Sequence, residues 1–234
     1  MMKTATLFLI PNLISDTEIN SVIPIIIKDK VIDLKFFIVE NIREARRYLK
    51  KLNNEIDINS ITFFELNQHT KENEISDFLY EAEKGNNFGL ISDAGLPCIA
   101  DPGNVIVKLA HEKNIKVVPL VGPSSIFLAL MASGLNGQNF AFNGYIPIEK
   151  NDRIKKIKLL EQKSVKEKQS QIFMDTPYRN NKLLADLINT LNFDTLLCIA
   201  FDISGENEFI VTRHIFEWKK NKPDLNKKPC IFIV

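Results

Sequence analysis

The sequence has little cysteine or histidine, and its apolar runs are short. Its 234 residues include three cysteines and three histidines, with neither a CxxC nor an HExxH motif. These residues give no support to a metal site, and scattered single cysteines are typical of the reducing cytoplasm. No apolar run approaches the roughly 20 residues of a membrane helix, and the start, MMKTATLFLIPNLISD, lacks a signal-peptide cleavage site. We expect a cytoplasmic protein with no metal and no membrane partner.

Several nucleotide and hydrolase motifs are also missing. The chain has no GxxxxGK[ST], no GxGxxG and no GxSxG, so a P-loop, the usual dinucleotide fingerprint and a hydrolase nucleophile elbow have no support. The glycine-rich first loop of the common methyltransferase fold is absent as well. The formal net charge of +1 neither favours nor excludes nucleic acid.

The first half of the chain alternates short β-rich runs with helical patterns. We predict strands at residues 4–10, 34–40, 61–66, 88–92 and 116–120, and helices at residues 41–52, 72–85 and 104–114. Strands that alternate with single helices favour βαβ units and a parallel sheet. The nearly continuous apolar runs are those of strands covered on both faces.

The second half is richer in strands than in helices. Strands are predicted at residues 140–145, 170–175, 195–202, 208–215 and 229–234, and helices at residues 124–134, 149–163 and 178–191. The helix at 124–134 is apolar on all sides, which predicts burial, and Gly134 would close it as a C-cap. We expect an α/β fold with a parallel-sheet domain at residues 1–120 and a mixed-sheet domain at residues 121–234.

The stretch GLISDAGLPCIADPGN follows one of the predicted buried strands. Asp101 as N-cap and Pro102 as first helical residue would make its end a simple helix start. That explanation leaves residues 93–98 unexplained, because a connection in an α/β unit normally takes about 2 to 6 residues. A glycine-containing loop at the carboxyl end of a parallel strand is where such sheets bind ligands. Similar loops recur at PLVGPSSI and at FMDTPYRN, where Thr176 is the predicted N-cap.

The segments LISDAGLPCIADPG, KVVPLVGPSS, NGYIP and IFMDTPYRN together resemble the tetrapyrrole methylase superfamily of S-adenosylmethionine-dependent enzymes. Within it, they are most similar to the ribosomal RNA small subunit methyltransferase I family, which methylates a cytidine ribose 2′-hydroxyl. The resemblance implies two α/β domains with S-adenosylmethionine held between them, and a homodimer.

The resemblance also implies a set of cofactor-binding residues. Carried over by position, they are Asp93, Gly95, Leu96, Pro97, Ile99, Ser124, Ser125, Asp175 and Thr176. Asp93 would either fix the loop or lie near the cofactor amino group. Leu96 replaces the threonine or aspartate that is usual there, a change of little consequence if the contact is made through the backbone.

Other departures fall in segments that the resemblance associates with the substrate. The family's first loop contains a glycine, whereas this chain reads IPNLISD, and its Glu-Asp-Thr-Arg segment is here ENIR. The chain stops at Val234, before the family's usual C-terminal extension. The resemblance therefore implies the cofactor class more firmly than the substrate.

Two residues of ENIR are candidate catalytic residues. Glu40 is predicted to do acid/base or orienting work on the substrate side, and Arg43 to contact an anion. The alternative is that both simply begin a solvated helix. A candidate RNA footprint comprises Arg43, Arg46, Arg47, Lys50, Lys51, Lys150, Arg153, Lys155, Lys156 and Lys158, unless these cations are ordinary solvated faces.

Three functions stay open at this point. The first is methylation of a small-subunit ribosomal RNA ribose, with ribosomal RNA or the small-subunit particle as partner. The second is the same cofactor chemistry on a small molecule such as a tetrapyrrole. The third is a non-catalytic cofactor-binding module.

Overall fold

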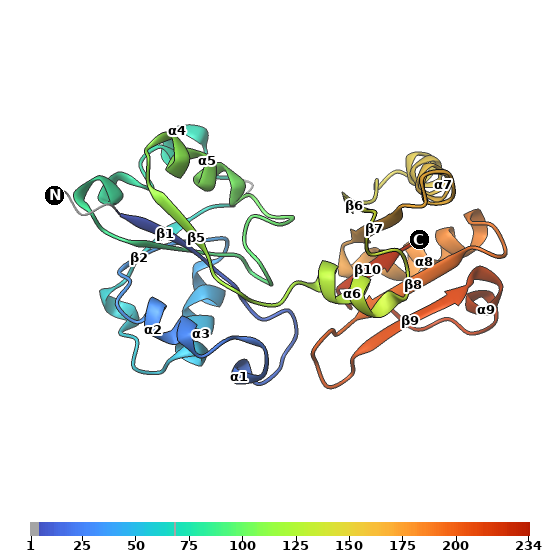
Figure 1. The fold of residues 1–234 in the computed structure, drawn as a ribbon, viewed down its shortest axis with the longest axis horizontal. Coiled ribbons are helices and arrows are strands. Elements are labelled where there is room, and N and C mark those ends of the chain that lie inside the picture. Colours follow the sequence, from blue (N-terminus) through green and yellow to red (C-terminus); the bar gives the residue numbers. More distant parts are fainter. Residues whose placement is uncertain (1–4, 68) are drawn as a thin grey trace. The chain divides into compact units, whose positions relative to one another are not determined.

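The computed structural model describes residues 5–67 and 69–234, which fall into two compact units. The N-terminal unit ends at Ser124 and the C-terminal unit spans Ser125–Val234 (Figure 1). Thr4, which begins the first predicted strand, lies outside the described residues. Each unit holds one five-stranded sheet, parallel in the first and mixed in the second, so the predicted fold class is confirmed. Within the described residues, no helix combines the length and apolar character needed to cross a bilayer.

The sheet of the N-terminal unit has the strand order β3-β2-β4-β1-β5, with every pair parallel. Its strands are β1 (Thr6–Ile10), β2 (Phe36–Val39), β3 (Thr62–Glu65), β4 (Phe88–Ile91) and β5 (Lys116–Pro119). Its helices are α1 (Ile19–Val22), α2 (Ile26–Val31), α3 (Ile42–Leu52), α4 (Glu72–Ile75) and α5 (Asn104–Glu112), with 3₁₀ turns at Ile58–Ser60 and Tyr80–Lys84.

Helices cover both faces of this sheet, with α2 and α3 on one side and α4 and α5 on the other (Figure 1). Successive strand residues point to opposite faces, so Phe37 and Val39 join the cluster under α2 and α3 while Ile38 joins the cluster under α5. All three are at most 1% exposed. Burial on both faces explains why these strands read as continuous apolar runs.

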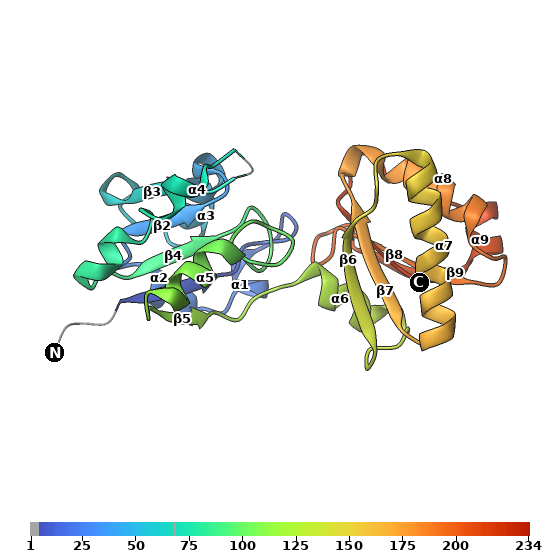
Figure 2. The ribbon, with the colours of Figure 1, turned by 90° about the horizontal axis from the view of Figure 1, so that it is seen from above.

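The sheet of the C-terminal unit has the order β6-β7-β10-β8-β9, with β6 and β7 parallel and the other pairs antiparallel. Its strands are β6 (Phe140–Tyr145), β7 (Ser170–Asp175), β8 (Leu196–Phe201), β9 (Phe209–His214) and β10 (Cys230–Ile233) (Figure 2). Its helices are α6 (Ser125–Ser133), α7 (Lys150–Glu167), α8 (Asn180–Thr190) and α9 (Ile215–Lys220), with a 3₁₀ turn at Pro177–Arg179.

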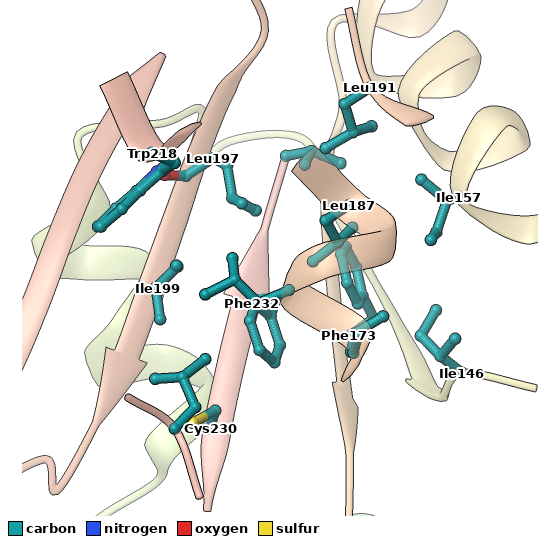
Figure 3. Close-up of a cluster of buried hydrophobic side chains, with 14 of the residues drawn as sticks. Ile146, Ile157, Phe173, Leu187, Leu191, Leu197, Ile199, Trp218, Cys230 and Phe232 are labelled. Atoms are coloured by element: carbon teal, nitrogen blue, oxygen red, sulfur yellow. The ribbon is translucent and has the colours of Figure 1, made fainter. Parts of the chain in front are cut away.

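The main core of the C-terminal unit lies between its sheet and the helices α7, α8 and α9 (Figure 3). Phe173 of β7 and Phe232 of β10 stack there with ring centroids 5.8 Å apart. Trp218 of α9, the only tryptophan of the chain, is 1% exposed and donates its indole N–H to the Leu197 carbonyl at 2.9 Å. This tryptophan therefore reports on the packing of the C-terminal unit.

Several predicted helices differ from those observed. The helix predicted at 72–85 is broken into α4 and a 3₁₀ turn, and α1, α2 and α9 were not predicted. The expectation of an all-round buried α6 is wrong, because Phe127 and Met131 are 48% and 79% exposed. Only the face that carries Ala129 and Leu130 is buried, where α6 packs on β9 and β10. Gly134 does end the helix, with a left-handed φ of +72°.

Candidate functional site

Most of the predicted site residues of the N-terminal unit lie at one edge of its sheet. Because all five strands are parallel, the segments that follow β1, β2, β4 and β5 leave the sheet at the same, carboxyl edge. Glu40 follows β2, the β4–α5 loop (residues 92–103) follows β4, and Ser124 ends the segment after β5. The neighbours β1 and β4 also send the chain in opposite directions, toward β2 and β5 respectively. Ligands of open α/β sheets bind at such a point.

The β4–α5 loop has an unusual backbone. Gly95, Cys98 and Ala100 have φ values of +69°, +70° and +65°, in the left-handed region. Glycine adopts this region freely, but each non-glycine residue there costs about 1 kcal/mol or more. The loop keeps this shape because its surroundings hold it.

Asn12, which follows β1, is one of the residues that hold the loop. Its buried side-chain amide donates to the carbonyls of Ser92 and Asp93 at 3.0 and 3.1 Å. Its backbone N–H donates to the Gly95 carbonyl at 2.8 Å, and its side-chain oxygen accepts from the Leu13 N–H at 2.8 Å. The sequence analysis missed Asn12, although a polar residue two positions after the end of a strand was a signal that could have found it.

Glu40 holds the same loop from the other side. Its Oε2 atom accepts a hydrogen bond from the Asp93 backbone N–H at 2.7 Å. The N-terminus of α3 is capped by Asn41 instead, whose side chain accepts from the N–H groups of Arg43 and Glu44. The alternative in which Glu40 merely begins a solvated helix is therefore wrong, since its carboxylate serves the loop after β4.

The surroundings of the three acids at this edge, Glu40, Asp93 and Asp101, disfavour the ionised form of each carboxyl group. Burial raises the pKa of Glu40 above its ordinary value of 4.5, the Asp93 N–H opposes this, and the charges of Asp101 and Asp93 add to the rise. Burial likewise raises the pKa values of Asp93 and Asp101. None of the three carboxylates forms an ion pair with any cation in the described part of the chain. This edge therefore favours a positively charged ligand.

A small cavity lies beside Glu40. It has a volume of about 10 Å³ and is lined by Val39, Glu40, Leu66, Leu90, Ile91, Ser92, Pro97, Asp101 and Gly103. That is about the room one water molecule takes.

The helix start predicted at Asp101 is two residues too early. The helix α5 begins at Asn104 with Gly103 as its N-cap. Asp101 lies in the turn before it, where its Oδ1 atom accepts from the Gly103 N–H at 2.6 Å. A β-carbon on Gly103 would lie 2.8 Å from that oxygen, so the tight turn requires glycine.

The segment after β5 packs against the segment after β1 and against the β4–α5 loop. A β-carbon on Gly122 would lie 2.1 Å from Cβ of Pro11, so only glycine permits this approach. A β-carbon on Gly95 would lie 3.5 Å from the Pro123 carbonyl oxygen. The structure thus brings Asp93, Gly95 and the buried Ser124 to one place, although they are predicted from separate segments.

The remaining loop residues differ in exposure. Pro97 is buried and lines the small cavity, Leu96 is half-buried, and Ile99 is 47% exposed. Burial raises the pKa of the Cys98 thiol to about 12, so it stays protonated and is no nucleophile. No group of three or more potential metal ligands occurs among residues 5–67 and 69–234.

The other predicted cofactor residues, Ser125, Asp175 and Thr176, belong to the C-terminal unit. Thr176 is the N-cap of the 3₁₀ turn at Pro177–Arg179, as predicted, although its side chain makes no capping bond. The buried Asp175 carboxylate accepts from the Thr176 N–H at 2.7 Å and from Nε of Arg179 at 2.8 Å. The Oδ1 atom of this carboxylate is therefore engaged by its own turn.

The predicted RNA footprint is only partly available. Arg43 is exposed, and Arg46 lies over the Phe63 ring at 5.3 Å. Arg153 contradicts its prediction, because it is 1% exposed and its Nε atom donates to Asp186 at 2.7 Å. A buried guanidinium cannot contact phosphate, so Arg153 serves the fold.

Comparisons with known proteins give consistent names. The chain is 30% identical over 238 residues to the ribosomal RNA small subunit methyltransferase I of Buchnera aphidicola subsp. Schizaphis graminum, which covers 99% of this chain and 78% of the relative. It is 30% identical over 175 residues to the Pasteurella multocida protein of that name, covering 74% and 61%. For the Vibrio cholerae protein the identity is 33% over 167 residues, covering 71% and 56%. The match thus spans less than two thirds of the last two relatives.

The fold also occurs among solved structures. A conserved hypothetical protein from Aeropyrum pernix K1 matches with a TM-score of 0.68 at 12% identity, over 99% of this chain and 84% of that one. At this identity the likeness shows the fold alone. No protein-family model matches the chain.

Proposed function

The chain belongs to the ribosomal RNA small subunit methyltransferase I family of tetrapyrrole-methylase-like enzymes, and on that premise we propose that it methylates a ribose 2′-hydroxyl of small-subunit ribosomal RNA. Membership makes it a methyltransferase by class. S-adenosylmethionine is the proposed methyl donor. The observation that carries the proposal is the match to named relatives over nearly the whole chain.

The edge of the N-terminal sheet suits this cofactor. S-adenosylmethionine, when bound, supplies an electrophilic methyl group on a positively charged sulfonium and also carries an ammonium group. Three acids without a cationic partner in the described residues fit such a ligand. The proposed cofactor-binding residues are Asp93, Gly95, Leu96, Pro97, Ile99 and Ser124 here, with Ser125, Asp175 and Thr176 of the C-terminal unit.

Within this set, backbone and side chain have different tasks. Asp93 offers its exposed carboxylate, because both polar atoms of its backbone are already bonded to Asn12 and Glu40. Leu96 contributes backbone only, which fits the loss of the usual threonine or aspartate. Asp175 acts by holding Thr176 and Arg179 in place.

On the substrate side, Arg43 is the proposed anion contact. It is exposed at the first turn of α3, close in sequence to Glu40. Its guanidinium would hold an RNA phosphate and so orient the ribose. Methyl transfer requires the hydroxyl oxygen, the methyl carbon and the sulfur in line, so orientation carries much of the rate.

The cofactor is tested first, by calorimetric titration with S-adenosylmethionine and S-adenosylhomocysteine. Gly95→Ala places a side chain at φ +69° with its β-carbon 3.2 Å from Ile14, and we expect affinity to fall about tenfold or more because the loop shifts. Gly134→Ala is the matched control, with φ +72° and nothing within 4 Å. No binding to the folded wild-type protein would refute the proposal.

The acceptor is tested with unmodified small-subunit RNA and particles. Transfer of a labelled methyl group, with resistance of the labelled linkage to alkaline cleavage, is expected for a ribose 2′-oxygen. Label on a base or on a tetrapyrrole alone would redirect the function to that acceptor. RNA affinity should also fall steeply with salt.

Arg43→Ala sharpens the RNA test. Loss of one phosphate contact should lower the slope of log affinity against log salt by about one. The control is Lys108→Ala on α5, whose exposed ammonium lies 3.9 Å from Glu112 and is outside the proposed footprint. Equal slopes for both variants would remove Arg43 from the interface.

Two further features are proposed from the family resemblance. The protein is expected to act in the cytoplasm and as a homodimer. Sedimentation equilibrium of the purified chain tests the second, with a mass twice the 26.7 kDa of one chain as the expected result.

A further inference from the structure

The geometry points to Glu40 and Asn12 as a pair of positioning residues that clamp the Asp93 peptide, with Glu40 acting as a hydrogen-bond acceptor and not as the base of the reaction. The inference rests on the proposed function, because the clamped loop is the proposed cofactor loop. It assigns a role to Asn12 and narrows the role of Glu40.

The clamp grips the two polar atoms of one residue's backbone from opposite sides. The Asp93 N–H donates to Glu40 Oε2 at 2.7 Å, and the Asp93 carbonyl accepts from Asn12 Nδ2 at 3.1 Å. Glu40 follows β2 and Asn12 follows β1, and these are the two strands that flank β4 in the sheet. The end of β4 is thus tied to both of its neighbours just beyond the last ladder pairs.

The clamp fixes the first residues of the β4–α5 loop, which set the direction in which the chain leaves β4. The Ser92 carbonyl also accepts from Asn12 Nδ2, and Gly95 exchanges backbone bonds with Asn12 and Leu13. Beyond Gly95 come the two left-handed residues Cys98 and Ala100, whose backbone conformations cost free energy and persist only where the surrounding structure holds them. The Asp93 carboxylate is therefore held in place by hydrogen bonds of the Asp93 backbone, not by bonds to its own oxygens.

The surroundings of the Asn12 amide and of the Glu40 carboxylate suit hydrogen bonds that hold the loop in place. Asn12 is 7% exposed, and its amide makes three hydrogen bonds through its two polar atoms. It is itself placed by the Tyr48 hydroxyl, which donates to the neighbouring Pro11 carbonyl at 2.5 Å. A half-buried carboxylate that already accepts a backbone N–H is well placed to hold that peptide.

Two substitutions of Glu40 separate positioning from base catalysis. Glu40→Gln keeps an oxygen that can accept the Asp93 N–H but removes the basic carboxylate, whereas Glu40→Ala removes both. A positioning role predicts that Glu40→Ala weakens S-adenosylhomocysteine binding about tenfold and that Glu40→Gln recovers most of this loss. Glu55→Ala, an exposed glutamate of the same unit, is the control.

Asn12 is tested in parallel. Asn12→Asp keeps the acceptor for Leu13 but sets a carboxylate against two carbonyl oxygens, so we expect a greater loss of cofactor affinity than for Glu40→Ala. Asn54→Ala is the control, because Asn54 is exposed and, among the described residues, only its backbone carbonyl is bonded. Should the Asn12 variant fail to fold, the Glu40 pair decides.

Amide hydrogen exchange at Asp93 gives a readout that needs no cofactor. The clamp predicts slow exchange in the wild type and in Glu40→Gln, and exchange about tenfold faster in Glu40→Ala. Unchanged exchange in Glu40→Ala would overturn the inference. So would a Glu40→Gln variant with normal cofactor affinity and turnover lowered a hundredfold or more, since that result identifies a base. Absence of cofactor binding to the wild type would refute the proposed function, while the exchange result would still decide the clamp.

Discussion

Glu40 in the N-terminal unit follows the buried strand β2, and Asp175 in the C-terminal unit ends the buried strand β7, yet their carboxylates bond over very different distances along the chain. Glu40 accepts from a backbone N–H that lies 53 residues away. Asp175 accepts from the next residue and from Arg179, four residues on. The first bond ties two segments together, whereas the second completes a local turn.

Other buried polar groups bond over long distances along the chain in both units, and they differ in what they hold. Asn12 bonds to carbonyls 80 and 81 residues away, at the edge where a ligand is proposed to bind. In the C-terminal unit, Arg153 and Glu161 bond to Asp186 and Thr195 beside the helical core. Long-range polar bonds thus shape a loop in one unit and stabilise packing in the other. The variants below separate these roles.

The largest effect is expected for Arg153→Ala. It leaves Asp186, with 12% of its side chain exposed, without its buried partner, and should lower the free energy of unfolding of the C-terminal unit by about 3–5 kcal/mol. Urea unfolding followed by Trp218 fluorescence reads this unit. Lys158→Ala, exposed on the same helix, should change it by less than about 0.5 kcal/mol. A small loss for Arg153→Ala would contradict a structural role.

Asp175→Ala should have the next largest effect on stability. It removes the acceptor of the Thr176 N–H and of Arg179, so unfolding of the same unit should become easier by about 1.5–3 kcal/mol. Trp218 fluorescence should detect this, whereas Glu40→Ala should leave that transition unchanged. If Asp175→Ala lowered cofactor affinity with no change in stability, the carboxylate would be a direct ligand instead.

Asn41→Ala tests which residue serves the helix α3. Loss of the N-cap should cost the N-terminal unit about 1 kcal/mol, measured by far-UV circular dichroism during urea unfolding, with Trp218 marking the other unit. Glu40→Ala should cost less, since it makes no cap. A larger cost for Glu40→Ala would mean that the carboxylate stabilises the fold as much as the loop.

The smallest effect concerns pH. The pKa of Glu40 is raised in the folded state, so the folded protein holds this proton more tightly and ionisation of Glu40 costs stability. That cost is absent below the ordinary pKa of 4.5 and develops as pH rises through the raised pKa. Glu40→Gln cannot ionise, so its stability relative to wild type should improve from acid to neutral pH. A constant difference in urea midpoints would contradict the raised pKa.

The sequence predicted the strands better than the helices. All ten strands of the described residues lie where β-branched and aromatic runs placed them, because burial on one or both faces selects those residues directly. The helix α9 was hidden because its start, Ile215 and Phe216, reads as a continuation of β9. The helix α5 starts late because the Asp101 carboxylate caps a turn instead of the helix.

The location of the site residues could be predicted from the sequence, but their hydrogen-bond partners could not. The polar residues Glu40 and Asp93 stand directly after buried strands, and a parallel sheet brings such residues to one edge. Their hydrogen bond depends on β2 and β4 being neighbours in the sheet. The sequences of these two segments do not reveal which strands pair. Asn12, two residues after β1, was not singled out from its position, and its partners 80 residues away are not evident from its own segment.

The pairing of β1 also governs when this edge can form during synthesis. Its only partners in the described sheet are β4 and β5, and the earlier of the two, β4, ends at Ile91. At about 5–20 residues per second, the ribosome needs roughly 4 to 16 s to make the intervening 80 or so residues. Throughout that time the apolar strand Thr6–Ile10 has no native neighbour to pair with. A nascent chain stalled before β4 should therefore be held by a chaperone at its N-terminal strand.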